Sequence, residues 1–224
     1  MNQENAAKFC AGCGYSVILM ILNQVLAAQN VQDKAVMGLD IGCSLLGWNY
    51  LPINTFQTHH GRVVPTMLGY KRARKESTSV AVVGDGGAYA IGWQSLFYAA
   101  RRDEPITVIV VNNSVYAMTG GQTAPTTVCG QKTDTHPAGS CEESFYGPEI
   151  LKTIVKPGAY LARSAANDPK GIFAALEKAV QTQQAGHFSL VEILSFCPTN
   201  WKTTGKATFD YLENLKKIYK IGEV

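Results

Sequence analysis

Two short stretches rich in β-branched residues lack any regular alternation of polar and apolar side chains. They are Ser79–Val83 and Ile106–Val111, and each is followed at once by glycine or asparagine. Continuous runs of this kind are typical of strands that are buried on both faces of a parallel sheet. Parallel neighbours need long connections that are usually helical. These two stretches therefore predict an α/β fold in which helices cover the sheet.

Helical and strand patterns alternate along most of the chain, which predicts a three-layer α/β/α fold around a mostly parallel sheet. With 224 residues and about 150 in a typical domain, we expect residues 1–224 to form a single domain. An N-terminal C-x-x-C segment and a C-terminal tail flank its regular part. The predicted helices are 16–29, 65–74, 91–101 and 169–184, and the predicted strands are 34–39, 79–83, 106–111 and 188–194.

Charge and hydropathy restrict the class of protein. Charged residues make up 17% of the chain, the net charge is +3, and 46% of residues are hydrophobic. This balance argues against disorder, and such sparse charge points to coverage of some surface by another subunit. The longest apolar run, Val17–Leu22, is shorter than the ~18 residues of a membrane span, so no membrane partner is expected. The N-terminus lacks a signal-peptide pattern, which predicts a cytoplasmic protein.

The basic cluster Lys71–Lys75 is typical of a solvated helix end, so no nucleic-acid partner is expected.

Polar, glycine-rich segments follow the two continuous strands, at the place where ligands of parallel α/β sheets bind. Asp85 lies in the first segment, Gly84-Asp85-Gly86-Gly87, and Asn113 follows the second strand. A carboxylate and an amide oxygen suit Mg²⁺, and a helix N-terminus favours phosphate. The alternative is a pair of tight turns with no ligand.

Cysteine spacing indicates a second centre. Cys10 and Cys13 form a C-x-x-C pair, but zinc and iron–sulfur sites usually need four ligands. Among the other cysteines, Cys43 and Cys197 are favoured because each follows a predicted strand and adjoins turn-forming residues. From the residues alone, zinc and an iron–sulfur cluster remain equally possible. The two cysteines left over are Cys129 and Cys141.

Several segments together resemble the β subunit of 2-oxoacid:ferredoxin oxidoreductases. The GDG…NN pair is similar to the thiamine-diphosphate motif, and the resemblance covers roughly residues 8–201. It implies a thiamine-diphosphate-binding fold of the diphosphate-module type, with thiamine diphosphate, Mg²⁺ and a 4Fe–4S cluster as cofactors. The segments are KFCAGCGYS, DIGCS, HHGRVVPTMLGYK, VVGDGGAYAIGWQ, VNNSVYAMTGGQTAPTT and SFCPTNW.

The resemblance also implies roles for individual residues. It gives Asp85, Asn113 and the backbone oxygen of Val115 as Mg²⁺ ligands. His60 and Met118 become catalytic candidates; the alternatives are a loop histidine bonded to a carbonyl and core packing, respectively. The implied cluster ligands are Cys10, Cys13, Cys43 and Cys197. The implied cofactor-binding residues are Ser44, His60, Gly61, Asp85, Gly86, Gly87, Asn113 and Val115.

By the same resemblance, the function is oxidative decarboxylation of a 2-oxoacid to acyl-CoA and CO₂, with electrons passing through the cluster to ferredoxin. No glutamate here matches the motif that activates thiamine, so an α subunit with a pyrimidine-binding domain would complete the site. Gamma and ferredoxin-like delta subunits or domains would complete the enzyme. The alternatives are a non-oxidative thiamine-diphosphate decarboxylase or synthase module and a zinc-stapled, non-catalytic α/β interaction subunit. Cys129 and Cys141 match nothing in the family and are interpreted as reduced bystanders or a regulatory pair.

Overall fold

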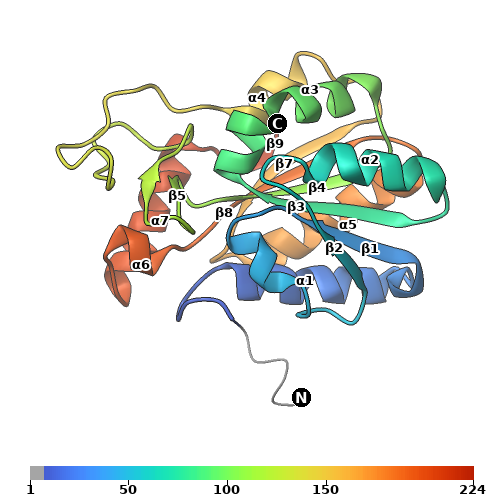
Figure 1. Cartoon of the computed structure of the whole chain (residues 1–224), viewed down its shortest axis with the longest axis horizontal. Coiled ribbons are helices and arrows are strands. Elements are labelled where there is room, and N and C mark those ends of the chain that lie inside the picture. Colours follow the sequence, from blue (N-terminus) through green and yellow to red (C-terminus); the bar gives the residue numbers. More distant parts are fainter. Residues whose placement is uncertain (1–7) are drawn as a thin grey trace.

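The computed structural model describes residues 8–224, which are built around a seven-stranded sheet (Figure 1). Its strand order is β2-β1-β3-β4-β8-β7-β9. Neighbouring strands are parallel throughout, except that β9 is antiparallel to β7. The prediction of a mostly parallel sheet is therefore confirmed. The strands are β1 (Ala35–Leu39), β2 (Asn54–Gln57), β3 (Thr78–Gly84), β4 (Thr107–Asn112), β7 (Tyr160–Ala165), β8 (Ser189–Leu194) and β9 (Gly222–Glu223).

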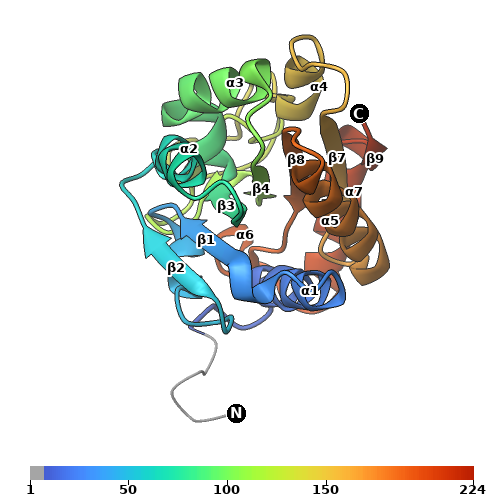
Figure 2. The same ribbon diagram turned by 90° about the vertical axis from the view of Figure 1, so that its right-hand side faces the viewer.

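Helices cover both faces of this sheet, as the end-on view shows (Figure 2). Helices α1 and α5 pack on one face, while α2, α3 and α4 pack on the other. This arrangement confirms the three-layer α/β/α prediction. The helices are α1 (Tyr15–Ala28), α2 (Val63–Ala73), α3 (Trp93–Arg102), α4 (Gly147–Lys152), α5 (Pro169–Gln184), α6 (Pro198–Trp201) and α7 (Lys206–Ile218), with 3₁₀ turns η2 (Gln32–Lys34) and η3 (Cys43–Gly47).

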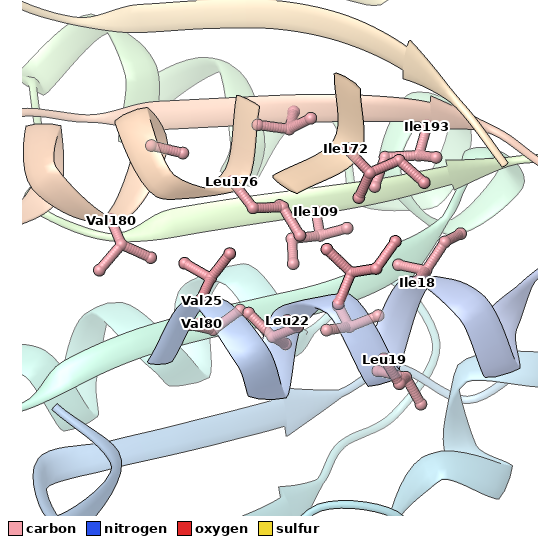
Figure 3. Packing of buried hydrophobic residues seen from close by; sticks show 14 of the residues in the cluster. Ile18, Leu19, Leu22, Val25, Val80, Ile109, Ile172, Leu176, Val180 and Ile193 are labelled. Atoms are coloured by element: carbon pink, nitrogen blue, oxygen red, sulfur yellow. The ribbon is translucent and has the colours of Figure 1, made fainter. Parts of the chain in front are cut away.

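The face covered by α1 and α5 shows why these helices form where the periodicity places them (Figure 3). Ile18 and Leu22 lie one turn apart on α1 and are fully buried, as is Leu176 of α5. They pack with Val80 and Ile109, which project from β3 and β4 toward this side of the sheet. Burying each such side chain stabilises the fold by roughly 1.5–3 kcal/mol. The layers therefore hold β3 and β4, and the loops that follow them, firmly in place.

The structure adds strands that the periodicity did not indicate. β7 has the sequence YLARSA, and its central Arg163 is fully buried and forms ion pairs with Glu192 of β8 and Glu149 of α4. The predicted helix at 91–101 is also modified, because a π-helical turn, η4 (Gly87–Ile91), precedes α3. The segment 119–147 is largely irregular as expected, although β5 (Val115–Tyr116) pairs with β6 (Gln122–Thr123) at its beginning. No helix in the described part of the chain has the length and apolarity required to cross a membrane.

Candidate functional site

A cavity of about 280 Å³ lies at the carboxyl end of the sheet, where the loops after β1, β2, β3 and β4 meet. Eight of the residues singled out from the sequence line it. Ser44, Gly61, Cys10, Cys13 and Cys197 do not line it directly. The lining residues are Tyr15, Ile41, Gly42, Cys43, His60, Gly84, Asp85, Gly86, Gly87, Asn113, Val115, Tyr116, Ala117, Met118 and Thr119.

Asp85 supplies a buried carboxyl group at the end of β3. It is only 2% exposed, and it accepts a hydrogen bond from the Thr126 hydroxyl. Burial raises the pKa of Asp85 to about 7, although the Thr126 hydroxyl and the Gly86 N–H favour the charged form. No ion pair among the described residues involves Asp85. A hard, buried oxygen ligand without a counter-ion is chemically suited to a divalent cation.

Asn113 occupies the corresponding place after β4. Its Oδ1 accepts the N–H of Val115 at 3.2 Å, and Ser114 adopts a left-handed conformation with φ of 59°. This local bonding is what the tight-turn alternative predicts. An amide oxygen has two lone pairs, however, so Asn113 retains one for a ligand in the cavity. Trp201 fixes the loop from the other side by donating its Nε1–H to the Asn113 carbonyl at 3.0 Å.

Two glycines allow this edge of the sheet to pack closely. A Cβ atom at Gly86 would overlap the Tyr116 ring, and one at Gly87 would overlap the Asp40 carboxylate. The missing side chains are therefore needed first by the protein's own contacts. Both glycines line the cavity at the start of η4, and the N-terminal end of a helical segment favours an anionic ligand.

His60 reaches the cavity from the loop after β2, and Asp40 holds it. His60 Nδ1 lies 2.9 Å from Asp40 Oδ2 and 2.8 Å from the Ile41 carbonyl, and Gly61 N–H donates to Asp40 Oδ1 at 2.6 Å. Asp40 is fully buried; burial raises its pKa, partly offset by His60 and the Gly61 N–H. With Nδ1–H held by this carboxylate, the neutral ring presents Nε2 as an acceptor. Sequence reasoning missed Asp40, since nothing in the spacing links it to His60.

The four favoured cysteines come from three separate segments and gather on one side of the cavity. Cys43 begins η3 and lines the cavity, whereas Cys197 is buried at the start of α6. The C-x-x-C turn is docked against this second segment, because Gly14 N–H donates to the Phe196 carbonyl at 3.4 Å.

The pKa values of the Cys43 and Cys13 thiols respond to burial and to the other cysteines of the group. Burial raises the pKa of Cys43 to about 12 and that of Cys13 to about 11, and the charges of the other cysteines in the group raise both further. Within residues 8–224, no three Cys, His, Asp or Glu side chains are grouped so that they could hold one metal ion. Cys129 and Cys141 are exposed, and both belong to the 119–147 segment.

Tyr15 is a further residue of the cavity that sequence reasoning missed. It lines the cavity but is only 2% exposed. Burial raises its pKa well above the usual value, and the charges of Cys43, Cys13 and Asp85 raise it further. A signal was available in the sequence, because Tyr15 follows the C-x-x-C segment by two positions.

Met118 lies at the cavity and is 46% exposed, so the core-packing alternative is wrong for this side chain. Among the described residues, the lining contains no glutamate. Glu192 instead bonds with Arg163 and Asn112 inside the sheet.

The sequence is similar to those of several known proteins. Residues 40–193 match the family model of the thiamine pyrophosphate enzyme, C-terminal TPP binding domain. The chain is 38% identical over 214 residues to the 2-oxoglutarate synthase subunit KorB of Archaeoglobus fulgidus, covering 95% of this chain and 76% of that subunit. It is 32% identical over 225 residues to the ketoisovalerate oxidoreductase subunit VorA of Methanothermobacter thermautotrophicus, covering 96% of this chain and 47% of the relative.

A solved structure is similar over nearly the whole chain. It is the 2-oxoglutarate:ferredoxin oxidoreductase from Magnetococcus marinus with 2-oxoglutarate, coenzyme A and succinyl-CoA bound. The TM-score is 0.81 at 26% identity, with coverage of 95% of this chain and 70% of that one. The predicted thiamine-diphosphate-binding fold is therefore confirmed.

Proposed function

Since this chain belongs to the family of beta subunits of 2-oxoacid:ferredoxin oxidoreductases and contains a thiamine-pyrophosphate-binding domain, we propose that it carries the diphosphate half of the active site. The complete enzyme would convert a 2-oxoacid and coenzyme A into acyl-CoA and CO₂ and pass two electrons to ferredoxin. The observation that carries the proposal is the position of Cys43, which lines the same cavity as Asp85 and Asn113. One cavity thus joins oxygen ligands for a metal–diphosphate group to a thiol of the four-cysteine group.

Asp85, Asn113 and the backbone oxygen of Val115 would hold Mg²⁺. The donor set supports this assignment, because Mg²⁺ prefers hard oxygen ligands and the Asp85 carboxyl group is buried and forms no ion pair with a described residue. Gly86 and Gly87 leave the start of η4 accessible to the diphosphate. Ser44 and Gly61 would act indirectly, by fixing Asp40. The Ser44 hydroxyl donates to the Asp40 carbonyl at 2.9 Å, and Gly61 N–H donates to the Asp40 carboxylate.

The cluster ligands in this proposal are Cys10, Cys13, Cys43 and Cys197. Four thiolates can each bind a different iron of a 4Fe–4S cluster, so they need not converge on one ion. Three of these thiols have raised pKa values because of burial, and bound iron would favour the thiolate forms. Since Cys43 borders the cavity, it supports a short path for electrons out of the site.

Bound thiamine diphosphate supplies the nucleophilic carbon and the electron sink for decarboxylation. The chain itself positions the reacting groups and can accept a proton. His60 offers Nε2 to a proton on the substrate or the diphosphate, because Asp40 occupies its Nδ1. Met118 stands at the cavity with an exposed apolar side chain, where it would contact the thiazolium ring or exclude water.

We propose an α subunit with a pyrimidine-binding domain as the partner that completes the site. Support comes from the described lining of the cavity, which contains no glutamate to activate the aminopyrimidine. Exposed Ile41, Ile91 and Met118 near the cavity would be covered by such a partner. Gamma and ferredoxin-like delta subunits or domains, and ferredoxin itself, complete the electron path in this proposal.

The test is anaerobic co-purification of the native complex with analysis of iron, sulfide and thiamine diphosphate. A panel of pyruvate, 2-oxoglutarate, 2-oxoisovalerate and indolepyruvate with a viologen acceptor then identifies the substrate. We expect a loaded complex that reduces viologen only when coenzyme A and one of these acids are present. A fully active complex without iron would favour the non-oxidative alternative. Absence of thiamine diphosphate, with Asp85→Ala fully active, would favour the zinc-stapled alternative, and activity of the isolated chain would overturn the divided site.

A further inference from the structure

Two exposed cysteines take no part in the proposed site. Cys129 and Cys141 lie in the 119–147 segment, twelve positions apart, and both are free thiols at the surface of this chain. The segment between them folds back on itself, because the backbones of Thr133 and His136 bond to each other in both directions at 3.2 Å. Its two arms therefore run side by side from this turn toward the cysteines.

Backbone hydrogen bonds fix how the two arms face each other. Gly130 N–H donates to the Ser140 carbonyl at 2.7 Å, and Ser140 N–H donates to the Gln131 carbonyl at 2.9 Å. The first of these bonds joins the peptide group that follows Cys129 to the peptide group that precedes Cys141. The second bond means that Ser140 faces both Gly130 and Gln131, and with the φ of 81° at Gly130 this is an antiparallel pairing with a bulge at these two residues. Cys129 and Cys141 are therefore the next opposed residues on the outer side.

Two cysteines opposed in this way can meet the geometry that a disulfide needs. In an antiparallel pair, residues just outside such a hydrogen bond have Cα atoms about 4.5 Å apart, with side chains close together. Disulfides join Cα atoms that are about 4.4–6.8 Å apart. Close packing of the arms is also evident at Gly139, where a Cβ atom would lie 3.0 Å from the Gly130 carbonyl oxygen.

We propose that Cys129 and Cys141 form a reversible disulfide that fastens this loop beside the cofactor cavity. The oxidant is a low-molecular-weight disulfide. One cysteine thiolate attacks it and releases one small thiol, and the second cysteine displaces the other small thiol. The protein loses two hydrogens and two electrons in total, and the small disulfide gains them. A reducing dithiol reverses the exchange.

The loop so fastened contacts the proposed metal site. Thr126 precedes Cys129 by three positions and donates its hydroxyl to Asp85, and Thr127 donates to the Ser114 carbonyl at 2.7 Å. Gln131, within the fastened loop, donates to the same carbonyl at 3.1 Å. A covalent link between the arms therefore restrains the segment that places the Thr126 hydroxyl on the Asp85 carboxyl group.

Trypsin offers a direct test, since Lys132 lies between the two cysteines. Complete digestion gives the peptides 103–132 and 133–152, and each contains one cysteine. The intact complex is equilibrated without oxygen in glutathione buffers of rising disulfide content, free thiols are alkylated, and the digest is analysed by mass spectrometry. We expect these two peptides to be joined in most molecules under oxidising buffer and to separate after reduction. Cys129→Ser, the matched control, gives only separate peptides.

The restraint that the disulfide places on the loop is measured separately, by the rate of tryptic cleavage in the native protein. Native cleavage at Lys132 is expected to slow by about threefold or more on oxidation, because a link between the arms suppresses local opening, and Cys129→Ser is expected to show no slowing. Three results overturn the proposal: both thiols stay free, both form only mixed disulfides with glutathione, or either pairs with another cysteine. An unchanged cleavage rate in the joined form overturns the fastening. None of these readouts depends on cofactor binding or activity.

Discussion

His60 Nδ1 lies 2.9 Å from Asp40 Oδ2, and the same carboxylate accepts Gly61 N–H at 2.6 Å. A second histidine–aspartate pair with the same arrangement lies at the amino ends of β4 and β8. There His187 Nδ1 lies 2.8 Å from Asp103 Oδ2, and Phe188 N–H donates to Asp103 Oδ1 at 2.8 Å. Only the first pair borders the cavity. The His187–Asp103 pair therefore serves as an internal control for the function of the His60–Asp40 pair.

Asp40→Asn is expected to reduce kcat/KM of the complex by about tenfold or more, because it removes the charge that holds Nδ1–H and leaves the His60 tautomer undetermined. The pH dependence of kcat/KM is expected to change as well, which a purely structural effect would not produce. Asp103→Asn keeps the geometry of the second pair and is expected to leave both unchanged. Equal behaviour of the two variants would contradict the role of Asp40.

Asp85→Asn tests the proposed metal site. Removing the negative charge is expected to weaken binding of Mg²⁺–thiamine diphosphate to the complex by about tenfold or more. Because burial raises the pKa of Asp85, a neutral side chain of the same shape is expected to leave the midpoint of thermal unfolding of the cofactor-free chain unchanged or higher. Calorimetric titration and thermal melts provide the two measurements. Weak binding together with a lower melting midpoint would indicate a folding defect instead.

The edge that holds Asp85 and Asn113 was predictable because parallel strands end at the same side of a sheet, so two loops 28 positions apart meet there. Asp40 was not predictable in the same way. Its relation to His60 depends on the pairing of β1 with β2, and the short, half-exposed β2 carries no periodic signal. Thr126 was hidden for a similar reason, since it reaches Asp85 from an irregular segment.

β7 was missed because a strand with Arg163 at its centre does not look buried. Arg163 is nevertheless enclosed, since Glu192 and Glu149 both bond to its guanidinium group. A charge is tolerated in a strand when its partners are supplied by neighbouring elements, and sequence periodicity contains no information about those partners. The same limit applies to any core position that depends on a distant counter-ion.

Cys43→Ser tests the cluster ligand that borders the cavity. Loss of this thiolate is expected to lower the iron and sulfide content of the anaerobically purified complex and to abolish viologen reduction, because the cluster lacks one of its four ligands. Cys129→Ser removes a cysteine outside the group and is expected to retain both. Full iron content and activity in the Cys43 variant would exclude this residue as a ligand.

Arg163→Ala is expected to destabilise the isolated chain by about 3–5 kcal/mol, because it leaves the fully buried Glu192 without its counter-ion. The measurement is the free energy of unfolding from urea titration. Lys178→Ala removes an exposed pair with Glu223 and is expected to cost at most about 1 kcal/mol. Similar losses in the two variants would contradict the structural importance of the buried pair.

Glu149 gives the fold a defined dependence on pH. Partial burial alone would raise the pKa of Glu149, but the bidentate bond with Arg163 outweighs it and lowers the pKa below its usual 4.5. The ionised form is therefore favoured in the folded state. Its contribution is fully present above the unfolded-state pKa and is lost as the pH falls through the lower, folded-state value. Glu149→Gln removes the charge, so wild type is expected to be more stable near pH 7, by up to about 1 kcal/mol because the side chain is partly exposed. Urea titrations from pH 7 down to about 3 would follow this difference, and Glu192 is common to both proteins and cancels. A difference that stays constant or grows as the pH falls below 4.5 would contradict the lowered pKa.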